Sequence, residues 1–136
     1  EGAKVINDTL KADFSATPYD FFAALDLAKA YVAAEDFAAA RTQLEYAATQ
    51  ADQAGLKAMA EVRLARVLIA LGELDAAKQL AEAYSGGAFA GEFAHIRGDI
   101  ARQQGDKAAA LQAYELALAG NASNQAYIEM KMNQVR

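Results

Sequence analysis

The chain contains no cysteine, one proline and one histidine among its 136 residues. Without cysteine it can form no disulfide and no thiolate metal site, and it has no cysteine nucleophile. Because the one histidine, His95, has no second imidazole to join it, a catalytic zinc site would be short of its usual ligands. These absences exclude cysteine chemistry and count against a metal-dependent enzyme.

Long apolar runs, excess basic charge and nucleotide-binding motifs are missing as well. No apolar stretch approaches the roughly 18 residues that a membrane-spanning helix requires. With a net charge of −5, the chain lacks the broad basic face of a nucleic-acid-binding protein. It has neither a phosphate loop nor a nucleophile-elbow motif. We therefore expect no nucleic-acid partner and no cofactor.

Alanine is the commonest residue of the chain, and β-branched residues are scarce. Alanine loses no side-chain entropy when a helix forms, so the composition favours helix throughout. Small side chains also let two helices approach closely, as helical hairpins require. The composition therefore predicts an all-α fold.

Three stretches of the chain repeat one another. Each places a turn after a helical pattern, and the turn positions 35, 72 and 105 are separated by 37 and 33 residues. An alanine follows each turn at the same offset, at Ala40, Ala77 and Ala110. A period of about 34 residues is typical of tetratricopeptide repeats, whose helix pairs stack into a solenoid with a concave binding surface. The repeats therefore predict a protein-binding scaffold rather than an enzyme.

We predict a tetratricopeptide-like, right-handed solenoid in one domain over residues 1–136. The expected elements are a short helix at 5–14, hairpins at about 21–54, 58–91 and 91–124, and a capping helix at about 123–135. The second helix of the second hairpin is expected at 74–84, and that of the third hairpin at 107–119. Gly55 is expected to break the chain after the first hairpin, and Ser123 is expected to cap the last helix. An unrelated alanine-rich helical bundle is the alternative.

In the consensus geometry of such repeats, the first helix of each hairpin contributes the residues that face the concave groove. Here these positions combine cations with apolar side chains. The candidate partner-binding residues are Lys29, Val32, Met59, Val62, Arg63, Arg66, Ile69 and Arg102. Because arginine binds carboxylates bidentately and buried apolar contacts supply most affinity, this face suits a peptide with acidic and apolar side chains. The alternative is a solvated face, or one packed beneath the N-terminal helix.

Glu92, His95 and Asp99 are spaced so that one helix face can carry an imidazole and two carboxylates. A metal site or acid–base chemistry would need such a face. However, no further histidine and no second carboxylate cluster accompanies it. A structural or surface role is therefore favoured, and we expect no catalytic residue and no metal ligand.

Five segments, taken in order, carry a family resemblance. They are LDLAK at 25–29, AEVRLARV at 60–67, IRGD at 96–99, GDK at 105–107 and EMKMN at 129–133. Together they resemble the periplasmic domain of the YfgM family, over nearly the whole chain.

The resemblance implies a bacterial inner-membrane protein with a tetratricopeptide-like domain on the periplasmic side and an N-terminal transmembrane anchor outside this sequence. It also implies an ancillary subunit of the SecYEG translocon that associates with the membrane-anchored chaperone PpiD. We therefore predict a non-enzymatic scaffold that tethers a PpiD-like chaperone to SecYEG and has unfolded secreted chains as further potential partners. A free-standing soluble tetratricopeptide adaptor in cytoplasmic assembly or regulation is the alternative.

Overall fold

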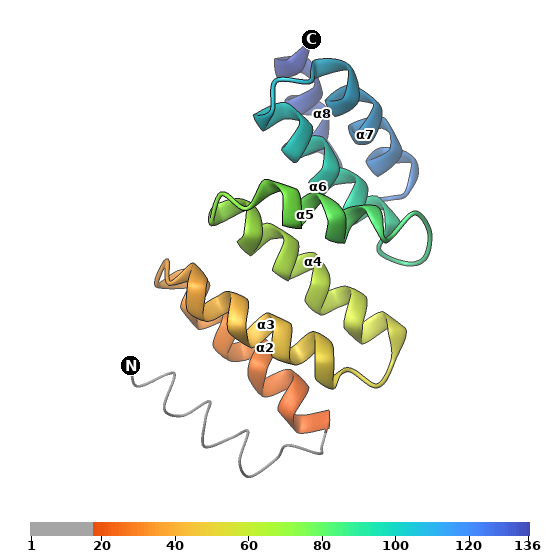
Figure 1. Cartoon of the computed structure of the whole chain (residues 1–136). Coiled ribbons are helices and arrows are strands. Elements are labelled where there is room, and N and C mark those ends of the chain that lie inside the picture. Colours follow the sequence, from red (N-terminus) through yellow and green to blue (C-terminus); the bar gives the residue numbers. More distant parts are fainter. Residues whose placement is uncertain (1–17) are drawn as a thin grey trace. The chain divides into compact units, whose positions relative to one another are not determined.

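The computed structural model describes residues 18–136, so the predicted helix at 5–14 lies outside the described residues. Within this range the chain forms seven α-helices and no strand, which confirms the all-α prediction (Figure 1). The helices belong to two compact units that divide between Gly72 and Glu73. Each unit is described by itself below.

The first unit contains α2 (Pro18–Ala33), α3 (Phe37–Gln50) and α4 (Ala54–Ala70). Helix α2 packs on α3, and α3 packs on α4. Ala28 of α2 and Ala40 of α3 are both buried in the first hairpin. Because each side chain is a single methyl group, the α2 and α3 backbones can lie close together, as the repeat pattern predicts.

The second unit contains α5 (Leu74–Glu82), α6 (Ala90–Gln103), α7 (Lys107–Ala119) and α8 (Gln125–Val135). Each of these helices packs on the next one along the chain. Its hydrophobic core joins α6, α7 and α8 through buried residues that include Tyr114, Ile128 and Met132. Helix α8 therefore covers an apolar surface of the preceding hairpin, as expected of a capping helix.

The turns that follow the first helix of each repeat share one backbone conformation. Glu35, Gly72 and Gly105 all have positive φ values, of 59°, 81° and 81°. In the first and third turns, the next residue donates its N–H to the carbonyl five positions earlier, over 2.9 Å. These are the bonds of a helix-ending motif that favours glycine, because other residues pay roughly 1–2 kcal/mol in the left-handed region. Glu35 adopts the same turn without that advantage.

Two local predictions are wrong. Gly55 does not break the chain, because α3 already ends at Gln50 and Gly55 lies in the first turn of α4. First-turn N–H groups have no partner within the helix, so a glycine there interrupts little. Ser123 does not cap α8: the N-cap is Asn124 in the left-handed region, and the Ser123 N–H donates to Glu92 Oε1 over 2.6 Å.

Side chains of α6 contact the C-terminal end of α5. The ring of Tyr84 stacks on that of Phe93, with centroids 4.1 Å apart. Arg97 donates from Nη1 to the carbonyls of Ala81 and Tyr84, over 3.0 and 3.4 Å. Ala81 lies in the last turn of α5, and its carbonyl also accepts the N–H of Tyr84 over 3.2 Å. These contacts secure the end of a helix of only nine residues.

Candidate protein-binding site

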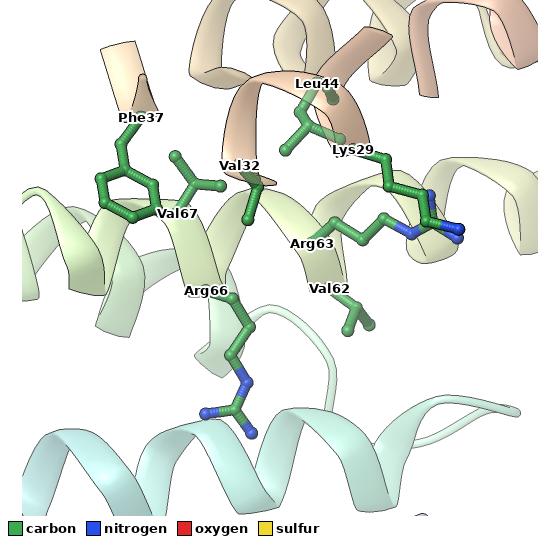
Figure 2. Close-up of a pocket in the computed structure, with 9 residues that line it drawn as sticks. Lys29, Val32, Phe37, Leu44, Val62, Arg63, Arg66 and Val67 are labelled. Carbon is green, nitrogen blue, oxygen red and sulfur yellow. The ribbon is translucent and has the colours of Figure 1, made fainter. Parts of the chain in front are cut away.

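The first unit contains a cavity of ≈ 400 Å³ between α2, α3 and α4 (Figure 2). Its lining is apolar except for three cations. The lining residues are Ala28, Lys29, Val32, Phe37, Leu44, Val62, Arg63, Arg66 and Val67. A concave, mostly apolar surface with a few charged groups is the usual form of a binding site in proteins.

Helical spacing places these side chains together. Lys29 and Val32 lie one turn apart on α2, and Arg63 and Val67 lie one turn apart on α4. Helix α3 supplies Phe37 from its first residue. Val32 remains 40% exposed although it is apolar. The cavity therefore presents apolar surface to solvent at the level of Val32.

The charge of the cavity is opposite to that of the whole chain. Lys29, Arg63 and Arg66 are the only charged residues in its lining, whereas the chain has a net charge of −5. Lys29 and Arg63 are exposed, and Figure 2 shows their charged ends on one side of the cavity. The site is therefore electrostatically suited to an anionic group.

The structure brings together five of the eight predicted partner-binding residues, all of them in this cavity: Lys29, Val32, Val62, Arg63 and Arg66. Met59 and Ile69 are half-buried on α4 and do not line it. Arg102 is exposed on α6 in the second unit and lines neither this cavity nor the one described below.

Four lining residues were absent from the predicted set: Ala28, Phe37, Leu44 and Val67. Phe37 and Leu44 come from the second helix of the hairpin, whereas the prediction considered only first helices. Their apolar spacing on α3 was visible in the sequence but indicated core packing. Val67 is itself buried, so it serves both the core and the cavity floor.

A hydrogen-bonded pair joins two of the helices that carry this cavity. Asp20, in the first turn of α2, is buried and accepts a hydrogen bond from the hydroxyl of Tyr46 on α3. Burial, followed by the hydrogen bond and the negative charge of Asp20, raises the pKa of Tyr46 to about 12. The neutral phenol is therefore the form that joins α2 to α3.

The predicted Glu92, His95 and Asp99 face does not form one site. Glu92 bonds the backbone of Ser123, whereas His95 and Asp99 are buried beside Lys131 of α8. Lys131 Nζ lies 2.9 Å from both His95 Nε2 and Asp99 Oδ1. No group of three or more potential metal ligands occurs within residues 18–136.

Lys131 and Asp99 form the centre of a polar network inside the second unit. Tyr114 donates its hydroxyl hydrogen to Asp99 Oδ1 over 2.6 Å, and Lys131 Nζ lies 4.1 Å from the ring centre of Tyr127. Because an ammonium group only donates, His95 Nε2 accepts from Lys131 and its ring proton lies on Nδ1. The network joins α6, α7 and α8, which assigns these residues a structural role.

A second cavity, of ≈ 390 Å³, lies in the second unit among α5, α6 and α7. Its charged lining is of mixed sign, with Lys78, Glu82, Arg97 and Asp106. Arg97 is engaged with the end of α5, and its burial lowers the pKa of the guanidinium. Asp106 caps α7 through the N–H of Ala109. This cavity therefore lacks the single-sign charge of the first.

Comparison with known proteins places the chain among helical repeat proteins. A family model described as a tetratricopeptide repeat-like domain matches residues 1–136. The chain is 36% identical over 122 residues to the ancillary SecYEG translocon subunit of Haemophilus influenzae, covering 89% of the chain and 60% of that relative. It is 29% identical over 119 residues to the Escherichia coli K12 protein of the same description, covering 86% and 58%.

The chain thus spans somewhat more than half of the length of these curated relatives. No solved structure matches it significantly. Among helices α2 to α8, none has the length and apolarity that crossing a membrane would demand.

Proposed function

We propose, because this chain belongs to the tetratricopeptide repeat-like domain family, that it is a non-enzymatic protein-binding domain that acts with the Sec translocon. The observation that carries the proposal is the cavity of the first unit, where three cations adjoin exposed apolar surface. The relatives in Haemophilus influenzae and Escherichia coli are described as ancillary SecYEG translocon subunits, which supports a partner in that machinery.

The proposed mechanism is tethering. The domain lies at the periplasmic face of the bacterial inner membrane and holds a PpiD-like chaperone beside SecYEG. Tethering raises the local concentration of a weakly bound partner, so even a modest affinity at the cavity suffices. Unfolded secreted chains are further ligands of the same apolar surface in this proposal.

The scaffold fixes the cavity before a partner arrives. Ala28 and Ala40 let α2 and α3 lie close together, and the Asp20–Tyr46 hydrogen bond joins the same two helices. Lys29 therefore projects from a helix whose position is already set, and Arg63 lies on α4, which packs on α3. A preorganised site loses less conformational entropy on binding than a flexible loop does.

The experiment is site-specific photo-crosslinking in cells that express the protein, with the probe at Val32 and a control probe at Glu115. Val32 lines the cavity and is already exposed, whereas Glu115 is exposed on α7 of the second unit. We expect the Val32 probe to capture a SecYEG subunit or a PpiD-like chaperone. Capture of these proteins by the Glu115 probe alone would exclude the cavity. Capture of only cytoplasmic proteins would favour a free-standing adaptor.

A further inference from the structure

Taking the proposed function as given, we infer that the cavity binds a peptide segment that carries a carboxylate and an apolar side chain on one face. The inference specifies the chemistry of the partner at this surface. It follows from the basic charge of the lining and from the apolar residues that adjoin the cations.

The carboxylate of the proposed peptide is inferred from charge complementarity with the cavity. The chain carries 18 acidic and 13 basic residues, yet the charged residues that line this cavity are all basic. A cationic segment would meet Lys29 and Arg63 without any lining carboxylate to compensate. An anionic segment gains charge-assisted hydrogen bonds, and a guanidinium can hold a carboxylate in two parallel ones.

The apolar side chain of the proposed peptide is inferred from the apolar residues of the cavity. In Figure 2, Phe37 and Val67 lie at one side, Lys29 and Arg63 at the other, and Val32 between them. Simple anions such as phosphate would leave this apolar surface uncovered. A ligand with an apolar side chain buries it, at about 25 cal/mol for each Å² removed from water.

Helix geometry sets the spacing of the cationic and apolar residues on α2 and on α4. Lys29 and Val32 are three residues apart on α2, and Arg63 and Val67 are four apart on α4. At a rise of about 1.5 Å per residue, the Cα atoms of each pair are separated by about 4.5 to 6 Å along the helix axis, so both side chains of a pair lie on one helix face. Residues i and i+2 of an extended peptide, about 6.7 Å apart, point to one face, so a carboxylate and an apolar side chain at these positions can both face the cavity.

The test uses a fluorescein-labelled peptide of glycine and serine residues in which an aspartate at position i is followed by a leucine at position i+2. Two analogues replace aspartate by lysine or leucine by serine. Fluorescence anisotropy with the whole chain is expected to show tighter binding of the aspartate–leucine peptide than of either analogue. Adding about 0.5 M salt is expected to weaken it, because salt screens exposed charges.

Variants locate the binding. Because exposed ion pairs contribute up to about 1 kcal/mol each and like charges repel to a similar extent, Lys29→Glu with Arg63→Glu is expected to weaken binding about 10-fold to 100-fold. The same variant is expected to bind the lysine analogue more tightly than the wild type does. Lys57→Glu with Lys107→Glu is the control, because it changes net charge equally at exposed helix starts outside the cavity.

Three results would overturn the inference: equal binding of the aspartate and lysine peptides, equal binding of the leucine and serine peptides, or no effect of the Lys29 and Arg63 reversals. A Val32 cross-link to residues 1–17 of the same chain, or to a second copy, would also overturn it by identifying a different occupant. Failure here is distinguishable from failure of the proposed function. If a translocon partner is captured at Val32 but its binding does not change in the Lys29→Glu and Arg63→Glu variant, the inference fails and the proposed function still holds.

Discussion

Gly98 lies where α6 meets α7, and no other residue fits its position. A Cβ atom there would lie 2.5 Å from the ring of Tyr114, which is fully buried and bonded to Asp99. Alanine ordinarily favours a helix over glycine by about 1 kcal/mol, but overpacking a core costs about 1–3 kcal/mol. We expect Gly98→Ala to lower the free energy of unfolding by up to about 2 kcal/mol, measured by urea denaturation.

Gly55 offers the matched control for that substitution. It also lies in a helix, but a Cβ atom there would meet nothing within 4 Å. We expect Gly55→Ala to leave stability unchanged or to raise it by up to about 1 kcal/mol. If both alanine variants behaved alike, the close approach of α6 to α7 at Gly98 would be refuted.

Tyr46 gives the first unit a pH-dependent contact. Its pKa is raised to about 12 from the ordinary value of 10.0, so the unfolded chain loses this proton before the folded chain does. The stabilisation is therefore complete below pH 10.0 and is lost as pH rises toward about 12.

We expect Tyr46→Phe to be less stable than the wild type at pH 8 by about 1–3 kcal/mol, because buried Asp20 loses its hydrogen-bond donor. The difference should shrink as pH rises from 10.0 toward about 12. Urea denaturation across that range provides the measurement. A difference that is constant with pH would show that the phenol titrates normally.

Helix α8 is held against α6 by one buried charge as well as by its apolar face. Lys131 is 3% exposed and bonds Asp99 and His95 of α6. Removing one partner of a buried ion pair leaves the other uncompensated, which costs about 3–5 kcal/mol. We expect Lys131→Met to cause a loss of this size, with hydrogen exchange increased first in α8.

The double variant Asp99→Asn with Lys131→Met tests the cause of that loss. It removes both charges and keeps a side-chain acceptor for Tyr114, so its stability should exceed that of Lys131→Met alone. If the loss of stability in the double variant equalled the sum of the losses in Asp99→Asn and Lys131→Met, Lys131 would contribute by packing and not by its charge.

The sequence predicted the bounds of some helices more accurately than those of others. Helix α7 has the predicted bounds of 107–119, because a turn glycine and the N-cap Asp106 mark its start. At α5 the sequence pattern extended the helix to Tyr84, but the helix ends at Glu82. Tyr84 instead stacks on Phe93. Propensity could not reveal that contact, because it depends on a residue in the following helix.

Over the whole molecule, periodicity predicted which side chains share a face but not which partners they take. The turns at 35, 72 and 105 and the cations of the cavity followed from the repeat pattern. The contact of Lys131 with His95 joins residues 36 positions apart and has no signature in a local pattern. The consensus also assigned one inner face to all three repeats, whereas the cationic cavity lies within the first unit.

The restriction of the cavity to one unit has a basis in the repeat register. Lys29 and Arg66 occupy equivalent positions of successive repeats, and the third repeat has Asp99 there. Asp99 is buried and bonded to Lys131, so this position serves the core of the second unit. We therefore expect partner binding to depend on the first unit, with the second unit contributing stability.

The most direct test is affinity purification of the protein from cells, with SecYEG translocon subunits quantified by mass spectrometry. The samples are the wild type, the Lys29→Glu and Arg63→Glu double variant, and the Lys57→Glu and Lys107→Glu control. We expect the cavity variant to recover about a tenth or less of the translocon, in line with the loss of two ion pairs, and the control to match the wild type. Equal recovery with both variants would contradict the assignment of the cavity as the binding surface.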